Sequence, residues 1–314
     1  MKVHYELAPS LPTFNNAVLT IGTFDGVHKG HQKILQQLRE TAIAVHGETV
    51  IITFHPHPRK IVSSVPGDVK LLTTLQEKIS LLEKAGIDHL VVVPFDHHFS
   101  NLSASAYISD FIVAFFKPHT VVIGYDHRFG KGRLGDFQLL EQLGLENGFV
   151  VNEISEQVLQ ESVVSSTKIR ASIAAHDIET ANIFLGYPYF FDGLVVEGNK
   201  VGRTIGYPTA NLHIAPEEKL IPSDGVYAVR VTIDEEEQVY AGMMNIGVRP
   251  TIDGKKRVVE VNIFNFDADI YGAQVKVELY YYLRGEVKFD GLEGLKAQLL
   301  QDKNKAAALL QGAV

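Results

Sequence analysis

The first residues whose types and spacing suggest chemistry are two histidines, His28 and His31, in the segment Gly-Thr-Phe-Asp-Gly-Val-His-Lys-Gly-His at residues 22–31. The segment joins an apolar run at 17–23, which predicts a buried strand, to a helical pattern that begins near residue 28. Residues three apart lie on one face of a helical turn, and a helix start presents unpaired N–H groups that bind phosphate. Two imidazoles there suit hydrogen bonding to the charge that develops on a transferring phosphoryl group.

The backbone around this pair also suits a nucleotide. Because glycine lets the chain approach a ligand closely, we expect nucleotide or phosphate contacts from Gly22, Phe24, Asp25 and Gly26. His55 follows a second predicted strand at 49–54, so it should lie at the same edge of the sheet. A zinc site made of His28, His31, His55 and His57 is a weaker alternative, because no acidic ligand pattern accompanies these histidines.

Two later segments add polar groups of the same kind. Asp126 lies in a glycine-flanked loop at 124–130 with an arginine beside it, which suits ribose and phosphate recognition, although an ordinary surface loop would look the same. Ser166 and Thr167 stand at a predicted helix start, and Arg170 follows one turn later. This arrangement predicts an anion clamp, with an ordinary helix N-cap as the alternative.

A second group of candidates lies in the C-terminal part of the chain. The loop at 198–211 contains Gly198, Gly202, Arg203 and Gly206, but it is neither a Walker motif nor a dinucleotide fingerprint because no helix is predicted after it. Thr209 and Asn211 offer oxygen atoms suited to Mg²⁺. Glu260 lies within a predicted strand at 258–266, where an isolated glutamate most often faces solvent. The glycine spacing by itself also fits a plain loop, so the residues alone indicate no more than a candidate Mg²⁺ site.

The elements that must position these residues change in type near residue 185. Before it, apolar strands alternate with amphipathic helices, which predicts an α/β domain over residues 1–184 with a parallel, Rossmann-like sheet that binds ligands at the carboxyl ends of its strands. After it, strands are predicted at 190–196, 226–233, 238–246, 258–266 and 275–283, and an amphipathic helix at 292–310. Residues 185–314 are therefore expected to form a small β-barrel with a C-terminal helix.

Composition narrows the class of protein. The 314 residues carry 29 Lys and Arg against 37 Asp and Glu, and the net charge of −8 argues against a nucleic-acid partner. The absence of Cys excludes a disulfide framework and a catalytic thiol. No apolar run approaches the roughly 20 residues that span a bilayer, and no apolar signal segment is found. We therefore expect a cytoplasmic protein without a membrane partner.

The motifs at residues 22–31 and 165–170 resemble those of the adenylyltransferase module of prokaryotic bifunctional FAD synthetases, which are His-X-Gly-His nucleotidyltransferases. The resemblance runs from about Leu11 to Arg170 and implies transfer of AMP from ATP to FMN, giving FAD and pyrophosphate. It implies that His28 and His31 are the signature histidines and that Asp126 lies in the adenosine pocket. It also implies that Ser166, Thr167 and Arg170 form a mobile phosphate-contacting segment. Where an aromatic residue is frequent in the family, this chain has His127.

The Pro-Thr-Ala-Asn segment at 208–211 is similar to the riboflavin kinase signature, and segments at 223–227, 245–251 and 259–262 match that family in order. This resemblance implies phosphorylation of riboflavin to FMN by ATP, with Mg²⁺ held at Thr209 and Asn211 and Glu260 as the base. Tyr227, Asn245 and Arg249 are the implied flavin contacts, and Arg284 and Phe289 match without an assigned role. Three alternatives stay open: one half is inactive, another small molecule receives the nucleotidyl group, or the protein is a flavin-binding regulator without activity.

Overall fold

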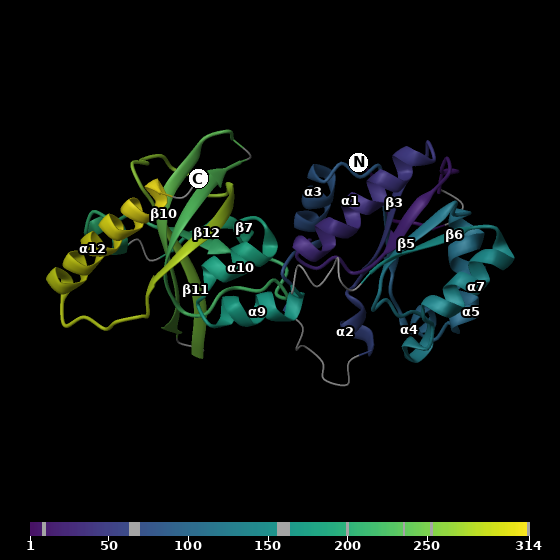
Figure 1. Ribbon diagram of the computed structural model, residues 1–314. Coiled ribbons are helices and arrows are strands. Elements are labelled where there is room, and N and C mark those ends of the chain that lie inside the picture. Colours follow the sequence, from purple (N-terminus) through teal and green to yellow (C-terminus); the bar gives the residue numbers. More distant parts are fainter. Residues whose placement is uncertain are drawn as a thin grey trace. The chain divides into compact units, whose positions relative to one another are not determined.

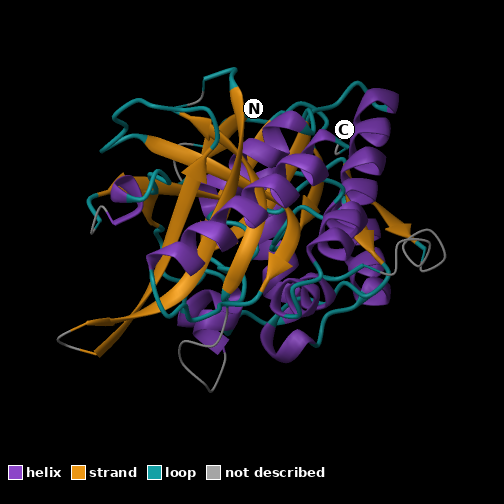
Figure 2. Ribbon diagram, turned by 90° about the vertical axis from the view of Figure 1, so that its left-hand side faces the viewer, coloured by secondary structure: helices purple, strands orange, loops and turns teal. Residues whose placement is uncertain are grey.

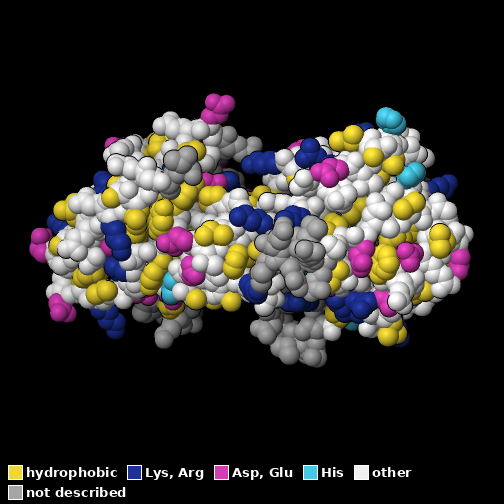
Figure 3. Space-filling model, viewed as in Figure 1, with side chains coloured by type: hydrophobic (Ala, Val, Ile, Leu, Met, Phe, Trp, Pro, Cys, Tyr) yellow, Lys and Arg dark blue, Asp and Glu magenta, His cyan; other side chains and the backbone are white. Residues whose placement is uncertain are grey.

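The computed structural model describes residues 1–7, 11–62, 70–155, 164–198, 201–234, 236–251 and 254–312. The chain forms two compact units, Met1–Ser165 and Ser166–Val314, each with its own hydrophobic core (Figure 1). On the face shown in Figure 3, basic, acidic and apolar side chains are interspersed on each unit. No helix in the described part of the chain is long and apolar enough to cross a membrane.

The N-terminal unit contains a six-stranded sheet of order β1-β4-β3-β2-β5-β6, and every pairing in it is parallel. Its strands are β1 (Lys2–His4), β2 (Val18–Ile21), β3 (Thr49–His55), β4 (His89–Pro94), β5 (Thr120–Gly124) and β6 (Val150–Ile154). The central strands are buried along almost their whole length, which is typical of a parallel sheet covered on both faces. The predicted parallel α/β sheet is confirmed.

Helices cover both faces of this sheet because successive strand residues point in opposite directions. Val18 and Ile51 pack with α1 (Lys29–Ala44) and α3 (Leu75–Lys84), whereas Leu19 and Ile52 pack with η1 (Tyr107–Val113) and α7 (Phe137–Asn147). The helical stretch from residue 104 to residue 116 consists of α5 (Ala104–Ala106), the π-helix η1 and α6 (Ala114–Phe116). The remaining helices of the unit are α2 (Pro58–Val62), α4 (His97–Ser100) and the 3₁₀ turn η2 (Lys131–Arg133).

The C-terminal unit contains a closed antiparallel barrel of order β10-β11-β8-β7-β12-β9, as predicted. Its strands are β7 (Phe190–Val196), β8 (Ala210–His213), β9 (Gly225–Ile233), β10 (Val239–Thr251), β11 (Gly254–Ile263) and β12 (Gln274–Arg284). The paired ends of β10 and β11 project as a two-stranded ribbon (Figure 2). The C-terminal helix α12 (Leu292–Gln311) packs on β9, β10 and β12, where Ala306 and Leu310 join the same apolar cluster as Ala228 and Met243.

Two helices before the barrel belong to the same compact unit. They are α9 (Ser166–Ala174) and α10 (Ile178–Leu185). The Asn182 amide on α10 donates to the Leu279 carbonyl of β12 at 2.9 Å and accepts from the Tyr189 N–H at 2.7 Å. The unit therefore begins at Ser166, whereas the predicted domain boundary between residues 184 and 185 falls at the end of α10.

Candidate active sites

His28 and His31 open helix α1 directly after strand β2. The Nδ1 atom of His28 caps the helix by accepting the His31 N–H at 3.4 Å. The two imidazole rings are stacked with centroids 3.7 Å apart and an angle of 16° between their planes. The spacing of the two histidines thus places them on one face of the first turn, as expected from the sequence.

The backbone leaves no spare room around this pair. A Cβ atom at Gly30 would come within 3.2 Å of the His28 ring, and Gly26 has a φ of +83°, in the left-handed region that favours glycine. Phe24 contacts the His31 ring, with centroids 5.1 Å apart. The glycines of the motif therefore allow a tight turn next to the two imidazoles, at the start of α1.

A network of buried polar side chains supports the turn. The Asp25 carboxylate accepts hydrogen bonds from the Thr73 N–H at 3.1 Å and hydroxyl at 3.4 Å, and the Thr73 hydroxyl accepts from the Gly26 N–H at 3.0 Å. Asp25 is 3% exposed. Asp25 therefore supports the loop between β2 and α1, and its predicted contact with a nucleotide stays a prediction.

Lys78 of α3 adds a buried cation that was not expected from the sequence. Its ammonium group donates to the Thr53 hydroxyl at 3.3 Å, and the residue is 6% exposed. Burial lowers the pKa of Lys78 to about 8, and the nearby Asp25 charge opposes that shift. The only sequence signal for this position is its spacing: Lys78 lies between Leu75 and Leu82 on the apolar stripe of the helix.

His31 is held as a neutral imidazole. Its pKa lies well below the ordinary value because the ring is desolvated, and because His28 and then Lys78 add unfavourable charge. Its Nδ1 atom is buried and has no hydrogen-bond partner among the described residues. A neutral histidine keeps one N–H donor and one acceptor, so His31 can bind a phosphate oxygen without carrying a positive charge itself.

The remaining candidates of the N-terminal unit lie at the carboxyl ends of strands, as expected. His55 ends β3 with an exposed side chain, and Asp126 is exposed just after β5. The neighbouring His127 has a buried Nε2 without a partner in the described structure, and burial lowers its pKa to about 4. No group of three or more His, Asp or Glu among the described residues could hold a metal ion, so the zinc alternative finds no support.

Ser166, Thr167 and Arg170 lie in the first turns of α9, which the sequence placed with the N-terminal domain. In the structure α9 belongs to the compact unit that contains the barrel. The predicted contact of these residues with a nucleotide phosphate stays a prediction.

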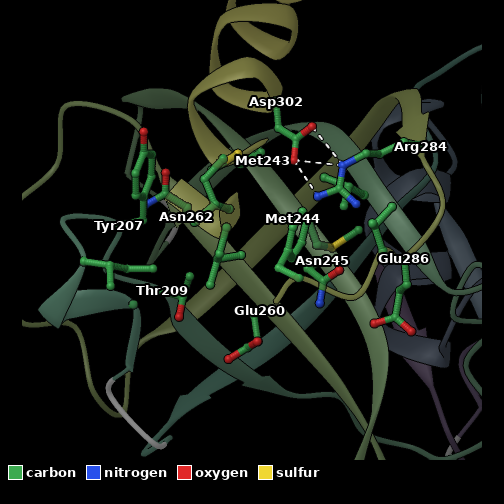
Figure 4. Close-up of a pocket in the computed structure, with 17 residues that line it drawn as sticks. Tyr207, Thr209, Met243, Met244, Asn245, Glu260, Asn262, Arg284, Glu286 and Asp302 are labelled. Carbon is green, nitrogen blue, oxygen red and sulfur yellow. Dashed lines mark hydrogen bonds and ion pairs between the residues drawn. The ribbon is translucent and has the colours of Figure 1, made fainter. Parts of the chain in front are cut away.

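The C-terminal unit contains a pocket of about 270 Å³ beside α12 (Figure 4). Its polar lining consists of Thr209, Asn245, Glu260, Asn262, Arg284, Glu286 and Asp302. Its other lining residues are Gly202 and the apolar or aromatic side chains of Ile205, Tyr207, Val226, Met243, Met244, Val287, Phe289, Leu295 and Leu299. Such a mixture suits a ligand with a large flat apolar part and a few polar groups.

Glu260 is positioned by the register of the barrel strands. It lies opposite Asn211 of β8 on one side and opposite Asn245 of β10 on the other. Asn211, Glu260 and Asn245 thus form a row across neighbouring strands. This row continues to Val226 of β9 and then to Arg284 of β12. Residues directly opposite each other in antiparallel strands point to the same face, so the row brings a carboxylate, two amides and a guanidinium to one surface.

The glycine loop before β8 lies against this row. A side chain at Gly198 would collide with the Asn211 amide, so the loop approaches Asn211 only because this residue is glycine. The Asn262 amide donates to the Pro208 carbonyl at 2.7 Å and so fixes the segment that contains Thr209. A short helix, α11 (Val201–Thr204), lies within the loop, and strand β8 follows it.

Thr209 and Asn211 fit the requirements of a magnesium site. A hydroxyl oxygen and an amide oxygen are hard ligands of the kind Mg²⁺ prefers. Thr209 lines the pocket, and Asn211 is the direct cross-strand neighbour of Glu260. These two residues could therefore hold an ion at the Glu260 end of the pocket.

The structure does not bring every predicted kinase residue to this pocket. Tyr227 points to the opposite face of β9 from Val226, is fully buried, and places its hydroxyl 2.9 Å from His176 Nδ1, while donating to the Ser223 carbonyl at 2.5 Å. The predicted flavin contact of Tyr227 is therefore replaced by an internal structural role. The side chains of Arg203 and Arg249 lie outside the described residues, and Gly206 does not line the pocket.

Most residues that line this pocket were not identified as site residues from the sequence, among them Asp302, Glu286 and Met243. Asp302 is 3% exposed on α12 and pairs with Arg284, and Glu286 follows β12 as another carboxylate in the pocket lining. Met243 forms part of the apolar wall. The sequence signal for Asp302 was its helical spacing from Leu295 and Leu299, which places the three residues on one face.

Comparison with known proteins identifies relatives along nearly the whole chain. The sequence model of the FAD synthetase family matches residues 11–168, and that of the riboflavin kinase family matches residues 185–310. The chain is 38% identical to a bifunctional riboflavin kinase/FMN adenylyltransferase of Listeria monocytogenes, with 98% of this chain and 96% of the relative covered. It is 38% identical to the protein of the same name from Escherichia coli K12, with 91% and 90% covered.

A solved structure has the same fold. The chain superimposes on a Streptococcus pneumoniae protein described as a macrolide-efflux protein with a TM-score of 0.85 and 32% identity, covering 95% of this chain and 96% of that one. The combination of parallel sheet and closed barrel is therefore shared along almost the full length of both chains.

Proposed function

Because the chain belongs to the family of bifunctional riboflavin kinases/FMN adenylyltransferases, we propose that it converts riboflavin and ATP to FMN and ADP, and then FMN and a second ATP to FAD and pyrophosphate. The first reaction is assigned to the barrel unit and the second to the unit with the parallel sheet. The observation that carries the proposal is that Glu260 and Asn245 line a pocket with a largely apolar wall, with Asn211 directly opposite Glu260 on the neighbouring strand.

The kinase reaction needs a proton acceptor because riboflavin offers a neutral primary hydroxyl. The Glu260 carboxylate accepts that proton as the hydroxyl oxygen attacks the γ-phosphorus of ATP. The new O–P bond forms as the bond to the leaving ADP oxygen breaks. The apolar wall would hold the flat ring of the flavin.

Thr209 and Asn211 would hold Mg²⁺ together with ATP. When bound, the ion would neutralise charge on the phosphates of the nucleotide. Gly198 and Gly202 allow the loop backbone to lie close to the same end of the pocket.

Adenylyl transfer requires no general base because the attacking group is the anionic phosphate of FMN. His28, the neutral His31 and the N–H groups at the start of α1 stabilise the charge on the α-phosphoryl group as pyrophosphate leaves. Lys78 contributes a positive charge near His31. Asp126 is assigned to the ribose, and the phosphate contact predicted for Ser166, Thr167 and Arg170 rests on the resemblance of their segment to the family motif.

Incubation of the full chain with riboflavin, Mg²⁺ and ATP, followed by chromatography of the flavins, tests this function. FMN should appear first and FAD later, and supplied FMN should give FAD without riboflavin. Production of FMN alone, or of FAD only from supplied FMN, would identify one inactive half. A protein that binds flavin but forms neither product would be a regulator, and product formed with CTP in place of ATP would indicate a different nucleotidyl donor.

A further inference from the structure

A largely buried ion pair between Arg284 and Asp302 lies in the pocket, at the end away from Glu260 (Figure 4). Arg284, the last residue of β12, donates from Nε to both Asp302 carboxylate oxygens at 3.0 and 3.1 Å and from Nη2 to Oδ2 at 2.7 Å. The Gln298 amide donates to the same carboxylate at 2.9 Å. Arg284 is thus held in one orientation by two residues of α12.

Arg284 retains donors that these bonds do not use. A guanidinium has five N–H groups. Among the described residues, Asp302 takes one from Nε and one from Nη2, and the Gly285 carbonyl accepts one from Nη1 at 2.8 Å. Two N–H groups, one on each terminal nitrogen, therefore stay available to a ligand. Arg284 is also the only cation among the described residues that line the pocket.

The distance between Arg284 and Glu260 can be counted along the barrel. From Glu260 the row passes through Asn245 and Val226 to Arg284, which is three strand spacings. At the usual separation of neighbouring strands this corresponds to about 14 Å along the sheet surface. Because the barrel is closed and has six strands, Glu260 and Arg284 come from strands on opposite sides of it, so a ligand that contacts both residues reaches across the pocket.

The apolar wall lies at the Arg284 end of this span. Leu295, Leu299 and Asp302 are spaced by four and then three residues on α12, so they share one helix face. The two leucines line the pocket beside the carboxylate that holds Arg284. The Arg284 end therefore suits a flat apolar ring with hydrogen-bond acceptors on one edge.

We infer that Arg284, oriented by Asp302, donates hydrogen bonds to the carbonyl oxygens on the polar edge of the flavin ring, while the polyol chain carries the terminal hydroxyl to Glu260. This inference rests on the proposed riboflavin kinase function and adds a specificity-determining residue to it. Because Asp302 balances the charge of Arg284, the pair suits a neutral carbonyl edge better than an anionic group. Asp302 and Gln298 are positioning residues.

The test compares the full-length parent with Arg284→Gln and Asp302→Asn, using three substrates. These are riboflavin, an analogue in which a ring carbonyl oxygen is replaced by the weak acceptor sulfur, and an analogue that lacks a methyl group on the benzene edge. The control variant is Asp224→Asn, which removes a carboxylate paired with Arg257 at 2.7 Å outside the pocket lining. KM and kcat are measured for each flavin and for ATP, and circular dichroism checks folding.

We expect Arg284→Gln to raise the KM for riboflavin about tenfold to a hundredfold, the range for a hydrogen bond to a charged group, with little change in kcat or in the KM for ATP. The parent should have a higher KM for the sulfur analogue than for riboflavin, and Arg284→Gln should lose this difference. The difference between riboflavin and the analogue that lacks a methyl group should be the same in Arg284→Gln as in the parent. Asp302→Asn should cause smaller changes of the same two kinds. Asp224→Asn should change neither the KM for riboflavin nor the discrimination against the sulfur analogue.

Unchanged discrimination against the sulfur analogue in both pocket variants overturns the inference. So does an equal change for both analogues, since it would indicate a general loss of packing. If Arg284→Gln does not fold, the Asp302→Asn result decides in the same way. A parent enzyme that makes no FMN from riboflavin would instead contradict the proposed function itself.

Discussion

Glu260 lies directly opposite Asn211 in the pairing of β11 with β8, and the Asn211 amide lies against Gly198 of the preceding loop. The proposed base, a proposed magnesium ligand and a backbone segment without a side chain are therefore neighbours. Strand register fixes the first two relative to each other, because opposite residues share a face of the sheet. The carboxylate is thus held by the barrel itself rather than by a loop.

The first prediction concerns the base. Glu260→Gln keeps the size of the side chain and removes its ability to accept a proton. FMN formation should fall by about 10²–10⁴-fold, the usual range for loss of a general base. FAD formation from supplied FMN should persist, because an anionic phosphate needs no base. Initial rates of both reactions, measured by chromatography, check this.

A second carboxylate in the same pocket provides the comparison for this variant. Glu286 also lines the pocket but is exposed. If Glu286 were the proton acceptor, Glu286→Gln would be the slower of the two variants. A Glu260→Gln enzyme that works at near the parental rate rules out Glu260 as the base.

The second prediction concerns the two stacked imidazoles. His28→Ala and His31→Ala should each lower the rate of FAD formation by about 10²-fold or more, the scale of one lost donor to the transition state. Riboflavin phosphorylation should survive both changes. His98→Ala, which removes an exposed imidazole of α4, is the matched control. Equal loss of both activities would indicate that His28 and His31 serve folding instead.

Sequence patterns predicted the features that depend on local spacing. His28 and His31 lie on one helical turn, as their spacing of three residues predicted. The parallel sheet, the barrel and the terminal helix followed from apolar periodicity. In each case residues close in the chain decide the outcome.

Features that depend on distant residues were missed. Tyr227 and Val226 are adjacent in a strand of apolar residues, so the pattern did not reveal which of them faces the pocket. Lys78 and Asp302 are charged side chains that become buried only because partners from other elements surround them. Strand β8 has only four residues, and a run that short has too little alternation to predict a strand.

The third prediction concerns the extent of the barrel unit. A fragment that begins at Ser166 should phosphorylate riboflavin, make no FAD, and be more stable than a fragment that begins at Leu185. The shorter fragment lacks α9 and most of α10, including the fully buried Ile178 and the Asn182 bonds to Leu279 and Tyr189. We expect its melting temperature to be lower by about 10 °C or more.

Thermal unfolding by circular dichroism and kinase assays of both fragments check this prediction. Equal stability would show that α9 and α10 contribute nothing to the barrel fold. A folded fragment from Ser166 without kinase activity would instead show that the kinase site needs residues from the N-terminal unit.

The last prediction concerns Lys78 and the pH dependence of adenylyl transfer. Because the pKa of Lys78 is about 8, its ammonium is mostly charged at pH 7 and loses its proton as the pH rises through 8. The rate of FAD formation from FMN should fall over that range, since the positive charge of Lys78 near His31 disappears. Lys78→Met should be about 10- to 100-fold slower at pH 7, the scale of one nearby charge in a partly screened site, and should lack this limb of the profile.

Deprotonation of Lys78 does not destabilise the folded protein, so unfolding caused by Lys78 would not account for the fall in rate above pH 8. The lowered pKa means that the unfolded chain holds more protons than the folded one between about pH 8 and the ordinary lysine value of 10.5, so this group makes the folded state more stable as the pH rises across that window. Lys78→Arg, which stays charged, should shift the loss of rate to higher pH. Riboflavin phosphorylation in the same samples controls for pH effects on the whole protein. Parallel pH profiles for the parent and Lys78→Met would show that the charge of Lys78 has no part in adenylyl transfer.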